Sequence, residues 1–186
     1  MKQQFQISMQ LKTEILHVNI SQSPSYFLKA LKALQSHRVA SWLCSEERQT
    51  LALFFQSRAS EVYGIDIHPA AEIGKGVMID HGSGVVIGET AVVEDNVSIF
   101  QGVTLGGTGK DIGDRHPKVR EGALLSASST ILGNVEIGRN AKVAAGSVVL
   151  SDVREHVTVA GVPAKEVGEA NTDKPAYDVD HSINNK

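Results

Sequence analysis

From Ile67 to Val149 an aliphatic residue returns every six positions, apart from two slips. A fixed short period is the signature of a solenoid, in which each repeat stacks on its neighbours. An ordinary run of strands would instead alternate apolar and polar residues with a period of two, between irregular turns. The period therefore predicts a parallel β-helix in which three six-residue repeats form one triangular coil. The residues that carry the period, here called anchors, are Ile67, Ile73, Ile79, Ile87, Val93, Ile99, Leu105, Val119, Leu125, Ile131, Ile137, Val143 and Val149.

A small or β-branched residue usually stands four positions after an anchor. Such a side chain fits a tight corner beside a narrow core, so we expect these positions to turn the chain from one side of the coil to the next. They are Ala71, Val77, Ser83, Ala91, Val97, Val103, Ala123, Ser129, Val135, Ala141, Ser147 and Val153.

The six-residue register slips twice. The spacing grows to eight between the third and fourth anchors, within residues 80–86, and to fourteen between the seventh and eighth, within residues 106–118. Insertions in a solenoid point outward and commonly build its binding face. Each slip carries a histidine beside an ionisable residue, His81 in the first and His116 in the second. We therefore look for chemistry at these two places.

Composition sets the outer limits. A chain of 186 residues with 41% hydrophobic but only 5% aromatic residues predicts a soluble protein with a thin aliphatic core. The formal charge of -3 gives no reason to expect a nucleic-acid or anionic-membrane partner. The single cysteine, Cys44, excludes an internal disulfide, and neither a membrane span nor a hydrophobic leader after Lys2 is recognisable. These features together predict a cytoplasmic location.

The pattern changes at both ends of the repeat. From Ser25 to Tyr63 the apolar spacing is helical, with a break near Ser45, and Ser23 and Pro24 suit a helix start. We expect two helices that cover the open end of the solenoid, where strand edges would otherwise stay unpaired. The end of the chain is polar and without period, which predicts disorder. The expected organisation is an N-terminal helical segment (1–64), a β-helix (65–167) and a flexible tail (168–186).

Six short motifs carry a family resemblance: Gly64–Ala71, Asp80–Gly84, Gly88–Val92, Val103–Gly109, Gly113–Lys118 and Ala160–Lys165. Together they resemble the successive motifs of the serine acetyltransferases, within the hexapeptide-repeat acyltransferase superfamily. The resemblance implies a mainly β fold, a left-handed parallel β-helix of hexapeptide repeats, whose hand the spacing alone cannot show. It also implies a homotrimer that transfers acetyl from acetyl-CoA to the hydroxyl of L-serine, the first step of cysteine synthesis from serine.

The candidate catalytic residues are His81 and Asp66. A serine hydroxyl is a poor nucleophile at neutral pH, so its attack on a thioester needs a general base, for which histidine is suited. A carboxylate should hold the other ring nitrogen and stabilise the imidazolium. Asp66 lies fifteen residues before His81, roughly one coil, so the two could face each other on adjacent rungs. The resemblance assigns the same pair.

Three further residues are candidates for substrate binding. Arg115 offers a planar fork for the substrate carboxylate, and His116 offers a second donor near the reacting oxygen. Asp80, beside a bulge, could meet the substrate ammonium. The resemblance places Arg115 and His116 in the substrate site.

Coenzyme A needs grooves for its pantetheine arm, backbone groups for its amides and cations near its phosphates. Glycines allow close approach of the backbone, small corner residues leave room for the arm, and lysines suit phosphates. We expect no metal. The candidate cofactor-binding residues are Gly106, Gly107, Thr108, Ala127, Lys142, Ala145 and Lys165.

Other functions are also compatible with a β-helix. The nearest is an O-acetyltransferase of the same superfamily that acts on a sugar or another hydroxyl acceptor. A zinc-dependent carbonic anhydrase on this fold needs three histidines around one metal, but no two histidines here lie within five positions of each other. A scaffold without activity would not need Asp66, His81 and His116.

The chain departs from the family pattern at both ends. Its N-terminal segment is short and lacks the aspartate expected ahead of the first helix, with Glu14 as the nearest acid. We therefore expect a trimer that does not pair into a hexamer. The chain ends in Asn184-Asn185-Lys186 rather than in isoleucine, so docking to O-acetylserine sulfhydrylase is not expected.

Overall fold

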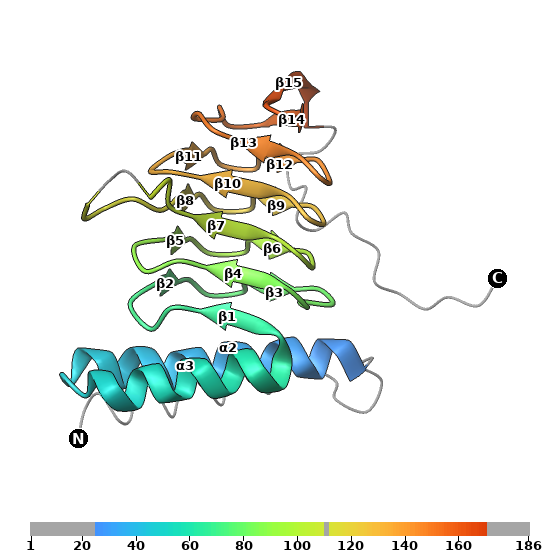
Figure 1. The fold of residues 1–186 in the computed structure, drawn as a ribbon. Helices are drawn as coiled ribbons and strands as arrows, with labels where there is room; N and C mark the ends of the chain where they lie inside the picture. The colour runs from blue at the N-terminus through green and yellow to red at the C-terminus, as the bar shows by residue number, and fades with distance from the viewer. Residues whose placement is uncertain (1–24, 110–111, 171–186) are drawn as a thin grey trace.

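The computed structural model describes residues 25–109 and 112–170. They form a β-helix that stands on two helices, α2 (Ser25–Ser45) and α3 (Gln49–Tyr63), as Figure 1 shows. The parallel β-helix predicted from the six-residue period is confirmed, and so is the helical break near Ser45. The expectations for the first helix cap at Ser23 and Pro24 and for the end of the tail lie outside the described residues. Neither described helix is long and apolar enough to span a membrane.

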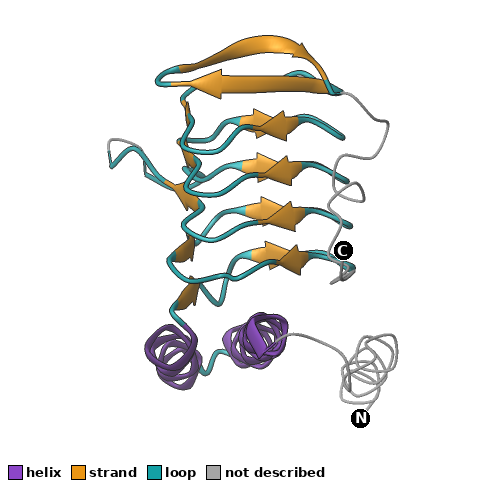
Figure 2. Cartoon of the chain, turned by 90° about the vertical axis from the view of Figure 1, so that its right-hand side faces the viewer, coloured by secondary structure: helices purple, strands orange, loops and turns teal. Residues whose placement is uncertain are grey.

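Three sheets form the three sides of the coil, and Figure 2 shows their strands stacked above the helices. Their strands are only two or three residues long, except in the last turn, and all pair in parallel apart from the final hairpin. Sheet A contains β1 (Ile65–Ile67), β4 (Val85–Ile87), β7 (Thr104–Gly106), β10 (Thr130–Leu132) and β13 (Val148–Val149). Sheet B contains β2 (Glu72–Ile73), β5 (Val92–Val93), β8 (Lys118–Val119) and β11 (Glu136–Ile137). Sheet C contains β3 (Met78–Ile79), β6 (Ser98–Ile99), β9 (Leu124–Leu125), β12 (Lys142–Val143), β14 (Val157–Gly161) and β15 (Ala164–Glu169).

Every anchor lies in a strand, and all of them except the partly buried Ile73 are buried. Anchors of successive coils are direct partners in the parallel ladders, so each aliphatic side chain rests on the one below it. In sheet A the resulting column is Ile67, Ile87, Leu105, Ile131 and Val149. The columns of the three sheets meet in one continuous core.

One expected corner residue was wrong. Ser83 was placed four residues after Ile79, but it is exposed, whereas Val85 is fully buried and fills the corner. The two inserted residues come before this position, so the corner is counted correctly from the following anchor, Ile87. Val85 stands two residues before its anchor Ile87, just as Val103 stands two residues before its anchor Leu105.

The two helices close the N-terminal end of the solenoid, as expected. Ala30, Ala33 and Leu34 of α2 share one hydrophobic core with Ile65 of β1. The large apolar residues of α3 instead point away from the β-helix, with Leu53 50% and Phe54 58% exposed. In α3 the buried residue is the small Ala52, which lets this helix approach the end of the coil closely.

The C-terminal end is closed by an antiparallel hairpin. β14 continues sheet C, and β15 folds back on it. β15 runs to Glu169, so ordered structure extends two residues beyond Val167, where the β-helix was expected to end. The division into three segments otherwise stays a prediction. The helices and the β-helix share one hydrophobic core.

A buried histidine in α2 generates a prediction about stability. His37 is 6% exposed, it hydrogen bonds the backbone of Ala71, and its Nδ1 has no hydrogen-bond partner among the described residues. Burial, together with the charge of Arg38, lowers the pKa of His37 to about 4 from an ordinary value of 6.5. The unfolded chain therefore takes up a proton at this site before the folded chain does.

We expect the free energy of unfolding to fall by up to about 3 kcal/mol through His37 alone as the pH drops from the ordinary histidine pKa towards about 4. Urea unfolding at several pH values, for the wild type and for His37→Gln, measures this. The substitution removes the titrating group, so its stability should depend less on pH in this window. An equal pH dependence in both proteins would show that His37 does not contribute.

Candidate functional site

The first slip forms a bulge at the corner between β3 and β4. His81 and Gly82 both have positive φ angles, 56° and 70°, and the amide of Gly82 donates to the carbonyl of Asp80 over 2.6 Å. Left-handed backbone is unfavourable for a residue with a side chain and is often held at functional sites. A Cβ at Gly82 would lie 2.6 Å from Cδ1 of Ile65, so glycine is required there. The core fixes the bulge from inside, and His81 is its outermost side chain.

His81 and Asp80 lie closer together than strand alternation would place them. Nε2 of His81 is 3.8 Å from Oδ1 of Asp80, which is within ion-pair range but too long for a hydrogen bond. The His81 side chain is 55% exposed, whereas that of Asp80 is 9% exposed. The bulge therefore presents an accessible imidazole beside a nearly buried carboxylate.

Asp66 projects outward from the middle of β1. Its neighbours Ile65 and Ile67 are buried, and side chains alternate along a strand, so the carboxylate points away from the core. Among the described residues, the hydrogen bond recorded for Asp66 comes from Nε2 of Gln56 in α3, at 2.7 Å from Oδ1, and not from His81. The predicted pairing of Asp66 with His81 thus stays a prediction.

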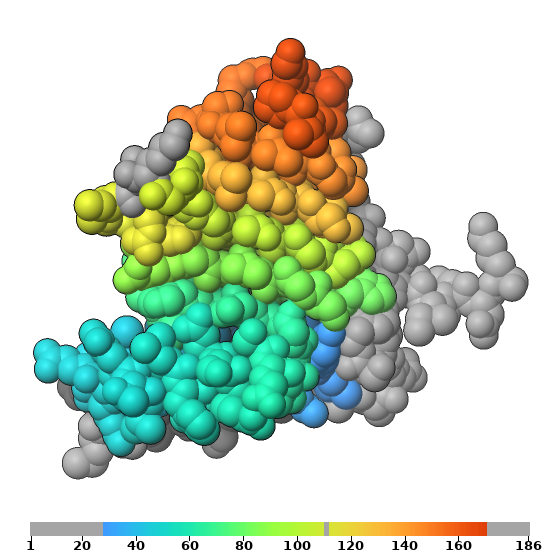
Figure 3. Space-filling view, in the orientation of Figure 1, coloured from blue at the N-terminus to red at the C-terminus, as the bar shows by residue number. Residues whose placement is uncertain are grey.

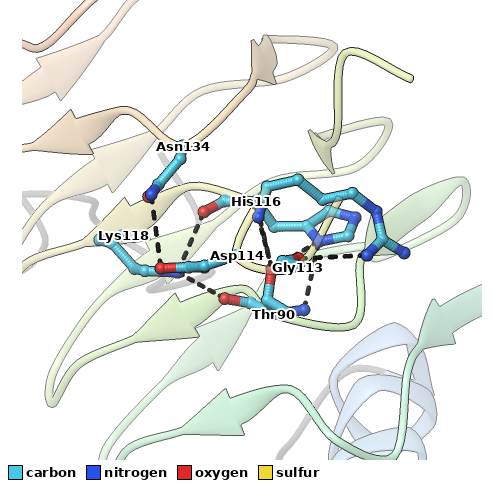
Figure 4. Close-up of polar contacts among 7 residues, drawn as sticks. Thr90, Gly113, Asp114, His116, Lys118 and Asn134 are labelled. Carbon is cyan, nitrogen blue, oxygen red and sulfur yellow. Dashed lines mark hydrogen bonds and ion pairs between the residues drawn. The ribbon is translucent and has the colours of Figure 1, made fainter. Parts of the chain in front are cut away.

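The second slip is tied to the corner below it by Thr90. The Thr90 hydroxyl oxygen accepts hydrogen bonds from the backbone amides of Arg115 (3.0 Å) and His116 (3.1 Å). It also lies 2.9 Å from Nδ1 of His116 (Figure 4). Because both amides donate to this oxygen, its own proton points to an acceptor, either Nδ1 of His116 or the Asp114 carboxylate, whose pKa Lys118 and this side chain both lower. One threonine therefore fixes both the backbone and the side chain of this loop.

The contacts of His116 define its protonation. Nδ1 also accepts from the backbone amide of Thr90 over 3.2 Å, so the neutral ring carries its proton on Nε2. Burial, followed by the charge of Arg115, lowers the pKa of His116 below its ordinary value. The ring packs on Gly88, where a Cβ would lie 2.0 Å from Cδ2. His116 is thus a neutral residue that can donate from Nε2.

Arg115 is held in place by two contacts. Nη2 donates to Oε2 of Glu89 over 2.8 Å, and Nη1 donates to the carbonyl of Gly113 over 3.2 Å. This hydrogen bond from Arg115 is the main reason why the pKa of Glu89 is lowered. The stem of Arg115 packs on Gly107, where a Cβ would lie 3.2 Å from Cγ. The guanidinium is therefore oriented at the surface, 32% exposed, with further N–H groups to offer.

Lys118 closes the loop at its base (Figure 4). Its Nζ donates to the carbonyls of Thr90 (2.6 Å) and His116 (3.2 Å). It also pairs with Oδ1 of Asp114 over 2.5 Å, while Asn134 donates to the other oxygen of Asp114 over 3.4 Å. The loop projects from the side of the solenoid in Figure 3, and these contacts connect its described ends to the coils on both sides.

The two predicted histidines stand at different corners of the coil. His81 lies between β3 and β4, and His116 lies between β7 and β8, so sheet A separates them. Five residues, Gly84 to Gly88, cross that face, and the four steps between them at about 3.3 Å each span roughly 13 Å. A single reacting atom cannot touch both rings within one chain.

The candidate coenzyme A residues are divided in the same way. Some lie at the corner of His116, others lie at the corner of His81, and the two lysines lie on sheet C. The chain alone does not bring them into one site. They are Gly106, Gly107 and Thr108 at the first corner, Ala127 and Ala145 at the second, Lys142 in β12 and Lys165 in β15.

Three residues of the site had no role in the sequence analysis. Glu89 and Thr90 belong to a recognised motif. An inserted loop lies between them and the residues they contact, Arg115 and His116, so their position in the sequence did not indicate these contacts. Gln56 gave no signal, because one polar residue in a helix is unremarkable. Among the described residues, no group of three histidine, cysteine, aspartate or glutamate side chains could hold a metal ion.

This chain is similar to a hexapeptide family model and to serine acetyltransferases. The family model described as bacterial transferase hexapeptide (six repeats) matches residues 116–151. A serine acetyltransferase of Salmonella typhimurium is 55% identical over 162 residues, which cover 87% of this chain and 59% of that protein. The chain thus spans about three fifths of the length of this relative.

Solved structures similar to this chain are also serine acetyltransferases. A serine acetyltransferase of Vibrio cholerae superposes with a TM-score of 0.80 at 57% identity, covering 84% of this chain and 61% of that one. One from Brucella abortus in complex with coenzyme A has a TM-score of 0.76 at 57% identity, covering 77% and 57%. A serine acetyltransferase in complex with cysteine has a TM-score of 0.79 at 52% identity, covering 83% and 60%.

The central place of Thr90 gives a prediction. Thr90→Val keeps the shape of the side chain but removes the oxygen that receives the amides of Arg115 and His116, so stability should fall by about 1–3 kcal/mol. Those two amide protons should also exchange faster with solvent, as hydrogen exchange followed by NMR can measure. Thr90→Ser retains the hydroxyl and is the matched control. Equal protection of both amides in the two variants would contradict the role of the hydroxyl.

Proposed function

We propose that this chain, which is 55% identical to a serine acetyltransferase over 162 residues, belongs to that family and transfers acetyl from acetyl-CoA to the hydroxyl of L-serine. The observation that carries this proposal is the bulge that presents an accessible His81 beside a nearly buried Asp80. Relatives bound to coenzyme A and to cysteine support the two ligands, because cysteine has the shape of serine with sulfur in place of oxygen.

In the proposed reaction His81 acts as general base. It takes the proton of the serine hydroxyl as that oxygen attacks the thioester carbonyl carbon. The tetrahedral intermediate then expels the coenzyme A sulfur, which recovers the proton from the imidazolium. The products are O-acetylserine and coenzyme A. A carboxylate near the ring, Asp66 or Asp80, stabilises the imidazolium while it carries the proton.

The other residues bind and polarise the substrates. The Arg115 guanidinium, oriented by Glu89, can offer its remaining N–H groups to the serine carboxylate. Asp80 supplies a negative charge for the serine ammonium. His116 can donate from Nε2 to the oxygen that becomes negative in the intermediate, because its Nδ1 is already engaged by Thr90.

We propose that the active site forms between two chains of a homotrimer. The proposed base and the proposed donor stand at opposite edges of sheet A in one chain. A neighbouring copy can place its His116 corner against the His81 corner of the first. The coenzyme A candidates, divided between the same corners, would then line one groove.

The proposed function predicts that His81→Ala lowers acetyl transfer by about 100-fold or more, because a general base contributes about this much. Thiol release from acetyl-CoA measures the rate, first for the wild type with serine, homoserine and simple sugars. Preference for a sugar would favour the related O-acetyltransferases instead. Near wild-type turnover in a folded His81→Ala protein would remove the base assignment.

A shared site also predicts complementation between two defective chains. His81→Ala and His116→Ala should each be weakly active alone, but trimers assembled from equal amounts of both would contain intact sites. Independent assortment makes about one quarter of the sites intact, since each needs a normal residue from two chains. Co-expression with two affinity tags followed by the thiol assay tests this. A mixture no more active than its components would place the whole site within one chain.

A further inference from the structure

The helical segment contacts the candidate catalytic carboxylate directly. Nε2 of Gln56, in the middle of α3, donates to Oδ1 of Asp66 over 2.7 Å. We propose that Gln56 is a positioning residue for Asp66, so that the helices act in catalysis as well as closing the solenoid. This inference rests on the proposed function, because it concerns the role of Asp66 in that reaction.

The chemistry of the two groups fixes the direction of the contact. An ionised carboxylate only accepts hydrogen bonds, so the amide of Gln56 must present its NH₂ group to Asp66. A hydrogen bond to one oxygen of a carboxylate restricts the rotation of the whole group. Oδ1 then accepts from Gln56, and Oδ2 and the second lone pair of Oδ1 can receive a proton donor such as an imidazole.

The position of Gln56 on its helix favours a specific role. Residues at helical spacing along the inner face of α3 are Ala52, which is 1% exposed, Gln56, and Tyr63, which packs on the core. Gln56 is a polar member of this face and is only partly exposed. A polar side chain on such a face needs a partner, and Asp66 supplies it.

The alternative is that the contact merely ties α3 to β1. A double-mutant cycle separates the two roles, because a positioning residue acts only through Asp66. The variants are Gln56→Leu, Asp66→Asn and the double substitution. Gln49→Leu, at an exposed position at the start of the same helix, is the matched control.

We expect Gln56→Leu to lower kcat about ten-fold or more, with the KM for acetyl-CoA within about two-fold of the wild type, since a hydrogen bond to a charged group is worth about that factor. In the Asp66→Asn background the same change should have little further effect. Gln49→Leu should leave kcat unchanged. Urea unfolding and light scattering verify that each variant is folded and assembled.

Gln56→Glu adds a test based on pH. A glutamic acid can donate to Asp66 only when it is protonated, so the activity of this variant relative to the wild type should rise as the pH falls. A purely structural contact would not produce this trend in kcat.

The inference is overturned if folded Gln56→Leu keeps wild-type kcat, or if its effect is equally large with and without Asp66→Asn. It is also overturned if the ratio of Gln56→Glu to wild-type activity is independent of pH. These outcomes leave the acetyl transfer of the wild type intact. A wild type that transfers acetyl to none of the tested acceptors would instead reject the proposed function, and with it the catalytic role of Gln56.

Discussion

The in-register stacking of one coil on the next is the constraint on which the rest of the structure depends. Strands of two or three residues cannot slide, because a shift of one residue would turn every anchor out of the core. Added residues must therefore leave the coil at a corner and project outward. The bulge at His81 and the loop before Lys118 are the two places where this happens, and both carry the ionisable side chains of the candidate site. The regularity of the core thus determines where chemistry can be placed.

The helical segment connects this core to the site. Gln56 of α3 contacts Asp66, and Lys29 of α2 donates from Nζ to the hydroxyl of Ser83 over 2.7 Å, two residues after His81. Each helix therefore holds a segment that carries one member of the proposed catalytic pair. These two polar contacts add to the apolar packing of the helices on the end of the solenoid. The end of the solenoid and the first bulge are in this sense one structural unit.

The sequence was sufficient for the parts of the structure that repeat. The anchors, the two slips and the break between the helices could be predicted because each follows from a local period. The placement of Val85 in the corner could not, since a slip does not reveal on which side of the corner its residues are inserted. Nor could the contact of Thr90 with His116, which lie 26 residues apart with a loop between them, or that of Gln56 with Asp66. Such contacts depend on how separate elements meet in space, and no period encodes them.

The two histidines of the site differ in a way that suits different tasks. His116 is buried, its Nδ1 accepts from Thr90, and burial lowers its pKa, so it stays neutral and can only donate from Nε2. His81 is exposed on a turn with positive φ, and its Nε2 lies 3.8 Å from Oδ1 of Asp80, so a carboxylate lies beside the ring. A ring that must gain and lose a proton needs contact with solvent or substrate, whereas a ring that donates from Nε2 is fixed by a hydrogen-bond donor to its Nδ1, as Thr90 is here. These differences suit the roles proposed above, His81 as the base and His116 as the hydrogen-bond donor.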